Sequence, residues 1–98
     1  MTWTVSFNEQ ARSELQEAAH YYGQESPTLR VAFLDAIAVA LDGLREQPKS
    51  APVVRGTIRS KPILRFPYNL LYTLRPGEIR ILAVMHQSRR PFYWLGRS

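Results

Sequence analysis

The chain has 98 residues, 45% of them hydrophobic and 21% charged, which is the composition of one ordinary globular domain with a single core. It contains no cysteine, so disulfides and thiolate metal sites are excluded, as is usual in a reducing cytoplasm. No stretch approaches the ~18 apolar residues of a membrane span, and Glu9 and Arg12 interrupt the N-terminus before a signal peptide could form, so we expect a cytoplasmic protein.

The charge is unevenly distributed along the chain. Residues 1–48 hold three arginines and seven acidic residues, a net charge of −4. Residues 49–98 hold ten lysines and arginines and one acidic residue, Glu78, a net charge of +9. A concentrated positive field predicts an anionic partner, for which nucleic acid, an acidic protein segment or an anionic membrane would each serve.

The first half of the chain predicts one strand and two helices. Apolar and polar residues alternate in residues 2–7, which is typical of a half-buried strand. Asn8 has the position of an N-cap, and apolar residues recur at helical spacing after it. Ser26 and Pro27 predict the cap and first residue of a second helix, which ends near Pro48. We expect these helices to form a hairpin.

The second half predicts three strands and a tail. In residues 54–66, a period of two would place an apolar set (Val54, Ile58, Leu64, Phe66) and a basic set (Arg55, Arg59, Lys61, Arg65) on opposite faces of a bulged or edge strand. Residues 68–74 and 79–85 are nearly all apolar, as strands covered on both faces would be. Pro76-Gly77 predicts a tight turn between them. The tail, residues 86–98, is polar, basic and aromatic.

These elements predict a single α+β domain over residues 1–98, in the order β-α-α-β-β-β. The helical hairpin would pack on a small, mainly antiparallel sheet. The residues expected to be buried are Val5, Leu15, Phe33, Ile37, Leu41, Leu44, Tyr72, Ile81 and Val84.

Three sequence segments follow one another along the chain: LDGLREQPKSAP at the end of the second helix, LRFPYNLLYTL in the middle strand, and ILAVMHQSRRPFYWLGR from the last strand into the tail. In this order and at this chain length they resemble the RelE/ParE family of toxins from bacterial type II toxin–antitoxin systems. The resemblance implies a cognate antitoxin, a small DNA-binding protein whose C-terminal segment folds onto the toxin in a hetero-oligomer. It implies no membrane partner.

The family contains two different activities, and the residues at two sequence positions distinguish between them. RelE-like members are ribosome-dependent endoribonucleases that cut mRNA, with Tyr-Arg-x-x-Tyr on the middle strand and a basic residue after the last strand. Here Asn69 stands in the place of the first arginine and Gln87 in the place of the second. These departures favour a ParE-like toxin, which would inhibit DNA gyrase by binding and not by catalysis.

Two alternatives remain open at the level of the sequence. In a RelE-like nuclease, the residues that would orient the RNA and stabilise the transition state are Arg65, His86, Arg89, Arg90 and Tyr93. The third possibility is a non-toxic nucleic-acid-binding module. An open reading frame for a short antitoxin beside the gene would separate the toxins from this module.

Basic and aromatic residues of the second half are the candidates for binding the antitoxin or the target, because Arg, Tyr and Trp suit both protein hot spots and nucleic acid. They are Arg55, Arg59, Lys61, Arg65, Arg89, Arg90, Tyr93, Trp94 and Arg97. The structural alternatives are a solvated strand face, a tail that folds back and buries Trp94, and a His86 bonded to backbone. We expect no cofactor, and no metal because only two widely separated histidines are present.

Overall fold

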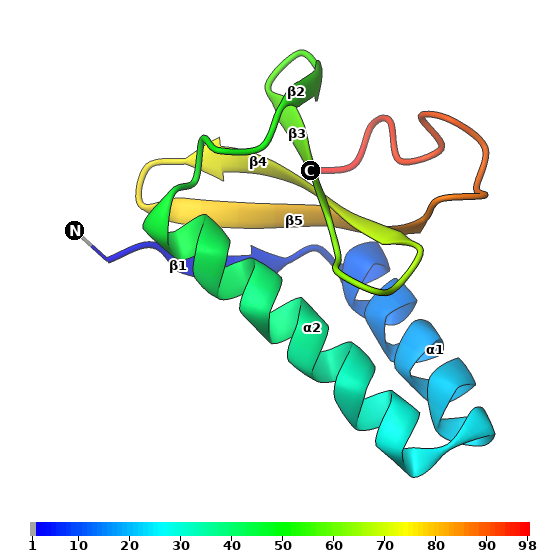
Figure 1. Ribbon diagram of the computed structural model, residues 1–98. Helices are drawn as coiled ribbons and strands as arrows, with labels where there is room; N and C mark the ends of the chain where they lie inside the picture. Colours follow the sequence, from blue (N-terminus) through cyan, green and yellow to red (C-terminus); the bar gives the residue numbers. More distant parts are fainter. Residues whose placement is uncertain (1) are drawn as a thin grey trace.

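Two helices cover one face of a five-stranded sheet in the computed structural model, which describes residues 2–98 (Figure 1). The elements in chain order are β1 (Thr4–Phe7), α1 (Glu9–Glu25), α2 (Pro27–Glu46), β2 (Val53–Arg55), β3 (Ile58–Pro62), β4 (Tyr68–Arg75) and β5 (Glu78–His86). The α+β class and the helical hairpin on a small sheet are therefore confirmed. Neither helix within residues 2–98 combines the length and the apolarity needed to cross a membrane.

The sheet has the strand order β1-β5-β4-β3-β2. The pairs β5–β4, β4–β3 and β3–β2 are antiparallel, whereas β1 runs parallel to β5. The sheet is thus mixed but mainly antiparallel, as predicted. It has one more strand than predicted, because Gly56 adopts φ +55° and turns the chain back between β2 and β3.

Both helix starts follow the predicted capping chemistry. The Asn8 side chain accepts a hydrogen bond from the Ala11 N–H at 2.7 Å and so caps α1. The Ser26 hydroxyl accepts from the Thr28 N–H at 3.1 Å, and Pro27 fills the first position of α2. These caps fix where each helix enters the layer that covers the sheet.

The main core lies between the helices and the sheet. Six of the residues expected to be buried are buried there: Phe33, Ile37, Leu44, Tyr72, Ile81 and Val84. The other three, Val5, Leu15 and Leu41, are partly buried at its margin. A second, smaller core lies on the opposite face of the sheet, where Trp94 of the tail packs on Leu71 and Ala83. The central strands are therefore covered on both faces, as their composition predicted.

The predicted alternation over residues 54–66 is wrong. The chain leaves the sheet after Pro62, so the phase of the pattern shifts and Ile63 is buried at 4% exposure while Leu64 is 73% exposed. Val54 is also exposed. The basic residues of this segment consequently do not form one continuous strand face.

Replacing Phe33 by alanine is expected to lower the free energy of unfolding by about 3–5 kcal/mol, because the ring is fully buried and its loss leaves a cavity. Its centroid lies 5.1–5.4 Å from those of Tyr22, Phe66 and Tyr68. Val31→Ala on the same helix is the control; Val31 is 57% exposed and its truncation should cost about 0.5 kcal/mol or less. Urea denaturation measures both values, and a loss below ~1 kcal/mol for Phe33→Ala would contradict this packing.

Candidate functional site

The C-terminal tail is held to the domain by one carboxylate on α1. Glu14 accepts hydrogen bonds from the Tyr93 hydroxyl at 2.6 Å and from the Arg97 guanidinium at 2.8 Å. It also accepts from the Val84 N–H of β5 at 3.1 Å. That N–H is available because β1 ends at Phe7, paired with Ile81, so β5 continues without a strand neighbour on this side. The tail is therefore docked in a defined position.

Two of the predicted binding residues in the tail are structural. Trp94, predicted as a binding residue, is 2% exposed in the second core and so offers almost no surface to a partner. Arg97 has a side chain that is only 12% exposed, pairs with Glu14 and also donates to the Leu82 carbonyl. Both residues hold the tail in place and do not face solvent.

Tyr93 is enclosed by charged groups. The guanidinium carbon of Arg89 lies 4.1 Å and that of Arg97 5.0 Å from the centroid of its ring. Burial, and then the hydrogen bond to Glu14 and its negative charge, raise the pKa of the Tyr93 hydroxyl far above its usual value. The hydroxyl therefore stays protonated and donates to Glu14, so it is not a ready proton donor for a substrate.

The two positions that depart from the nuclease pattern are neighbours in space. The Gln87 side-chain amide donates to the Asn69 amide oxygen at 3.1 Å, and the Asn69 amide donates to the Ser60 hydroxyl at 2.8 Å. This chain of neutral groups crosses from the end of β5 to β3. It supplies no positive charge to a phosphate at the point where RelE-like members are expected to place two arginines.

His86 ends β5 and bonds to its own turn. Its Nδ1 accepts from the Ser88 N–H at 3.0 Å and lies 2.7 Å from the Ser88 hydroxyl. Its ring contacts that of Tyr68 edge-on, with centroids 5.1 Å apart. With Arg89, it lines a hollow of about 220 Å³ beside α1. The predicted structural role of His86 is thus present, although the hollow leaves the histidine accessible.

The five residues of the nuclease alternative are not brought together. His86 and Arg89 share the hollow, but Tyr93 is bonded to Glu14 and does not line it. Arg65 lies on the loop after β3 and lines a different cavity. Arg90 is exposed in the tail. Of the five residues, the hollow therefore brings together only His86 and Arg89, beside the Glu14 carboxylate.

The basic residues of β2 and β3 have separate roles. The Arg59 guanidinium donates to the carbonyls of Lys49 and Ala51 at 3.0 and 2.7 Å, so it fastens the loop after α2 and is not a free binding residue. The Arg55 guanidinium carbon lies 5.3 Å from the centroid of the Phe92 ring. Of the predicted basic set, only Lys61 of β3 and Arg65 of the following loop border a large groove.

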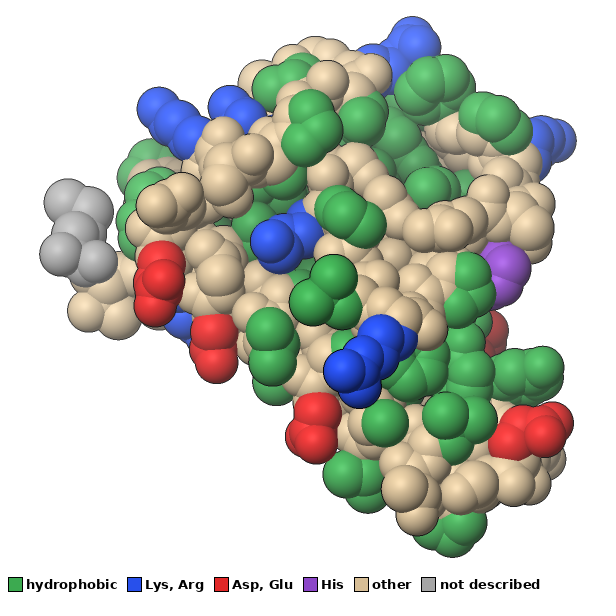
Figure 2. Space-filling model, viewed as in Figure 1, with side chains coloured by type: hydrophobic (Ala, Val, Ile, Leu, Met, Phe, Trp, Pro, Cys, Tyr) green, Lys and Arg blue, Asp and Glu red, His purple; other side chains and the backbone are tan. Residues whose placement is uncertain are grey.

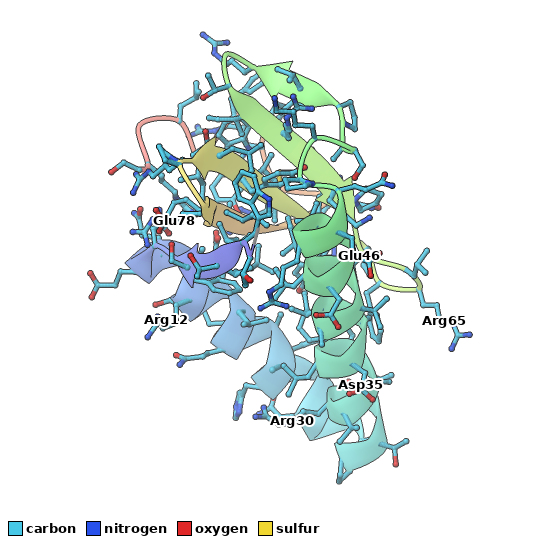
Figure 3. The ribbon with its side chains drawn as sticks, turned by 90° about the vertical axis from the view of Figure 1, so that its left-hand side faces the viewer. Arg12, Arg30, Asp35, Glu46, Arg65 and Glu78 are labelled. Atoms are coloured by element: carbon cyan, nitrogen blue, oxygen red, sulfur yellow. The ribbon has the colours of Figure 1, made fainter. Side chains whose placement is uncertain are left out.

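This groove, which we call the α2 groove, runs between α2 and the segment 61–66 and encloses about 860 Å³. Its lining is mostly apolar or small and consists of Leu29, Ala32, Asp35, Ala36, Val39, Ala40, Gly43, Lys61, Pro62, Leu64, Arg65 and Phe66. On this face, hydrophobic side chains and a few Lys or Arg side chains mix over the middle, and acidic side chains follow the line of α2 (Figure 2). Figure 3 shows Arg65 projecting from the loop beside α2, and Asp35 on the helix itself.

Sequence reasoning missed the helical wall of the α2 groove and one residue of the tail. The signal for the groove was present, because α2 carries an exposed valine at position 39, where a solvated helix face would be polar. Phe92 is 43% exposed and adopts φ +60°, a conformation that costs free energy for a bulky residue. No pattern in the sequence predicts the positive φ of Phe92.

Within residues 2–98, no group of three or more His, Asp or Glu side chains is arranged to hold a metal ion. The charged residues of the site are instead used in hydrogen bonds, ion pairs and stacking on aromatic rings.

The stability of the protein is expected to fall more steeply with pH above 10 than that of Tyr93→Phe. The pKa of Tyr93 is raised above its ordinary value of 10.0 by burial and by Glu14, so the folded state retains a proton that the unfolded state loses. The stabilisation is complete below pH 10 and disappears as the pH rises above it. One retained proton adds about 1.4 kcal/mol per pH unit to the slope of wild type. Urea titrations between pH 8 and 11 measure the free energy of unfolding at each pH. Parallel plots of this free energy against pH for the two proteins would exclude the Tyr93–Glu14 bond in solution.

The comparisons with known proteins give a family and a fold. The chain matches the family model described as the ParE toxin of the type II toxin–antitoxin system parDE over residues 5–91. It is similar in structure to a chain described as belonging to the chromosomal ParDE toxin–antitoxin system from P. aeruginosa, with a TM-score of 0.73, 17% identity, and coverage of 87% of this chain and 96% of that chain. At that identity the likeness shows a shared fold. No curated protein sequence gives a match. Because the family model spans most of its length, the chain belongs to the ParE toxin family of type II toxin–antitoxin systems.

Proposed function

We propose that this protein is a cytoplasmic toxin that inhibits DNA gyrase by binding it and that a cognate antitoxin neutralises it. The observation that carries the non-catalytic part is the Asn69–Gln87 amide pair, which leaves neutral groups where a nuclease needs cations. The bond from Tyr93 to Glu14 adds to it, because it withholds the hydroxyl from proton transfer. Family membership argues against a plain nucleic-acid-binding module.

The tail is the surface that we assign to the target. Anchoring by Glu14 and Trp94 leaves the intervening residues presented to solvent, with Phe92 and Leu95 43% and 47% exposed. Arg90 is also exposed, and the Arg55 guanidinium lies over the Phe92 ring. A rigidly held aromatic ring beside arginines is typical of the energetic centre of a protein interface. The ring remains exposed although its backbone conformation is strained, and this combination supports a binding role.

The purified toxin is expected to leave ribosome-bound mRNA intact and to inhibit gyrase supercoiling. Two well-placed cations are absent, and the loss of each one should reduce nuclease activity by about 10²–10³-fold. The assay compares wild type with His86→Ala and Tyr93→Phe on the same ribosome complexes, beside a separate supercoiling assay. Rapid cleavage by wild type that both variants lose would overturn this proposal in favour of the nuclease.

Phe92→Gly is expected to weaken gyrase inhibition by about tenfold or more, as the loss of an interface anchor does. Its unfolding free energy should stay within about 1 kcal/mol of wild type, because glycine relieves the positive φ and so offsets the lost contact of the ring with Trp94. Phe92→Ala removes the same ring but keeps the strain, so it should inhibit equally weakly and be less stable than Phe92→Gly. Full inhibition by both variants would show that the target does not contact this ring.

A further inference from the structure

We propose that the hollow beside α1, which we call the α1 hollow, binds a guanine nucleotide. Its walls come from α1, from the start of β4, and from the end of β5 with the turn that follows it. The lining residues that carry the argument are Glu17, Tyr21, Tyr68, His86 and Arg89. This site is additional to the proposed inhibition of gyrase, and its assignment rests on the chemistry of the hollow alone.

The α1 hollow lies on the face of the sheet that the helices cover. Tyr68 is paired with His86 across β4 and β5, and Tyr68 packs against the main core under the helices. Asn69 is paired with Met85, which packs in the second core on the opposite face. The α1 hollow is therefore separate from the amide pair of Asn69 and Gln87, where the nuclease pattern would place its cations.

The α1 hollow contains one carboxylate and one guanidinium that are not used in ion pairs. Glu14, the other carboxylate of the lining, is already paired with Arg97 at 2.8 Å. Within residues 2–98, no ion pair includes Glu17 or Arg89. A ligand that matches both groups must carry hydrogen-bond donors for the carboxylate and a negative charge for the guanidinium. A nucleotide has both, because its base carries N–H donors and its phosphate is anionic.

Arg89 is held in position by an aromatic ring. Its guanidinium carbon lies 4.1 Å from the centroid of the Tyr93 ring. A guanidinium stacked on a ring still directs its N–H groups outward in its own plane, and this rigid fork matches two phosphate oxygens at once. Arg89 is therefore preorganised to bind a phosphate.

Two tyrosine rings supply a surface for a base. Tyr21 is 58% exposed, and Tyr68 lines the same hollow. Every base has a flat π face, and the stacking of an unpaired base on aromatic side chains is a recurring mode of nucleotide binding. The volume of about 220 Å³ is smaller than the ~300–1,000 Å³ of pockets for drug-sized ligands, so it suits the base of a single nucleotide.

The polar groups of the α1 hollow favour guanine. Nδ1 of His86 accepts from the Ser88 N–H, so the neutral imidazole carries its proton on Nε2 and offers a donor. The ionised carboxylate of Glu17 only accepts. Guanine presents two adjacent donors, N1–H and N2–H, beside the O6 acceptor, so one carboxylate and one N–H donor complement this edge. Uracil and thymine would instead set a carbonyl oxygen against the carboxylate.

Other occupants match the α1 hollow less well. An aromatic side chain of a partner protein would leave both the Glu17 carboxylate and the Arg89 guanidinium without a partner. Inorganic phosphate alone would be repelled by the two carboxylates of the lining, Glu14 and Glu17.

Titration calorimetry with guanosine monophosphate (GMP) and with the corresponding adenosine, cytidine and uridine nucleotides tests the base preference. GMP is expected to bind about tenfold or more tightly than the uridine nucleotide, because a bidentate contact discriminates between bases. Glu17→Gln should weaken GMP by about tenfold and change the uridine nucleotide by less than about threefold. Glu25→Gln is the matched control: it is the same change at an exposed residue of the same helix that does not line the hollow. It should bind GMP as wild type does.

Two further variants test the phosphate and the base separately. Arg89→Met should weaken GMP but not guanosine, which lacks the phosphate, whereas Arg90→Met, the same change at the neighbouring exposed arginine, should leave GMP unchanged. Tyr21→Ala should weaken all four nucleotides by about tenfold, because stacking does not depend on the identity of the base. Circular dichroism checks that each variant is folded.

The ligand can be a free nucleotide or one residue of a single strand, and short oligothymidylates distinguish these sources. An oligomer with one central deoxyguanosine is compared with the all-thymidine oligomer and with GMP. Binding of the guanine-containing strand about tenfold tighter than both identifies a strand as the ligand, and equal affinities for this strand and GMP identify the free nucleotide. A duplex that pairs the same guanine should not compete, since its donors are occupied.

Three results overturn the assignment. They are no detectable binding of GMP or of the guanine-containing strand at about 1 mM, equal affinities for the guanine and uridine nucleotides, and equal losses in Glu17→Gln and Glu25→Gln. If Glu17→Gln and Tyr21→Ala bind nucleotides as wild type does but inhibit gyrase less, the hollow receives a side chain of the target. The nucleotide site is then wrong and the proposed function stands. If the wild-type protein binds GMP as expected but does not inhibit gyrase, the proposed function fails and the nucleotide site stands.

Discussion

The position of the C-terminal tail depends on one partly buried carboxylate. Glu14 lies on the first helix, its side chain is 14% exposed, and it joins the backbone of β5 to Tyr93 and Arg97 of the tail. A carboxylate this enclosed is tolerated only when donors surround it, and removal of one partner leaves an uncompensated charge. The short β1 strand creates the opening that Glu14 fills, because it leaves the second half of β5 without a neighbour. Local strand length therefore sets the geometry of a surface some eighty residues later in the chain.

This anchoring changes what the scaffold can do chemically. Tyr93 and Arg97, which could have served a substrate, are committed to Glu14, and the amide pair of Asn69 and Gln87 replaces two cations. Docking of the tail leaves Phe92 exposed at its surface. The same fold can carry catalysis or binding, and the choice lies in a few side chains at one face of the sheet. In this chain those side chains favour binding.

Much of the fold could be predicted from the sequence because its signals are local. The caps at Asn8 and Ser26, the stripe that buries Phe33, and the apolar central strands all act within a few residues. The site could be predicted only in part, because its residues are paired by tertiary contacts. The sequence pattern predicts a surface cation at Arg59, but its guanidinium donates to two carbonyls of a loop eight to ten residues earlier. Trp94 fills a core on the face of the sheet opposite the helices. The period of two also failed beyond Pro62, where the chain leaves the sheet and no hydrogen-bonded neighbour enforces alternation.

The α2 groove and the tail are separate surfaces of the molecule. Ring contacts connect them: Phe66 of the groove and Tyr68 both contact Phe33, and Tyr68 contacts His86, where the tail begins. Contact alone does not establish coupling, which requires a tail with two arrangements of similar free energy. Hydrogen bonds to a charged group each contribute about 1.5–3 kcal/mol, so releasing those that Tyr93 and Arg97 donate to Glu14 would cost about as much as, or more than, the 1–3 kcal/mol of a typical allosteric coupling. The comparison of these magnitudes favours a tail that stays docked when another surface of the molecule is occupied.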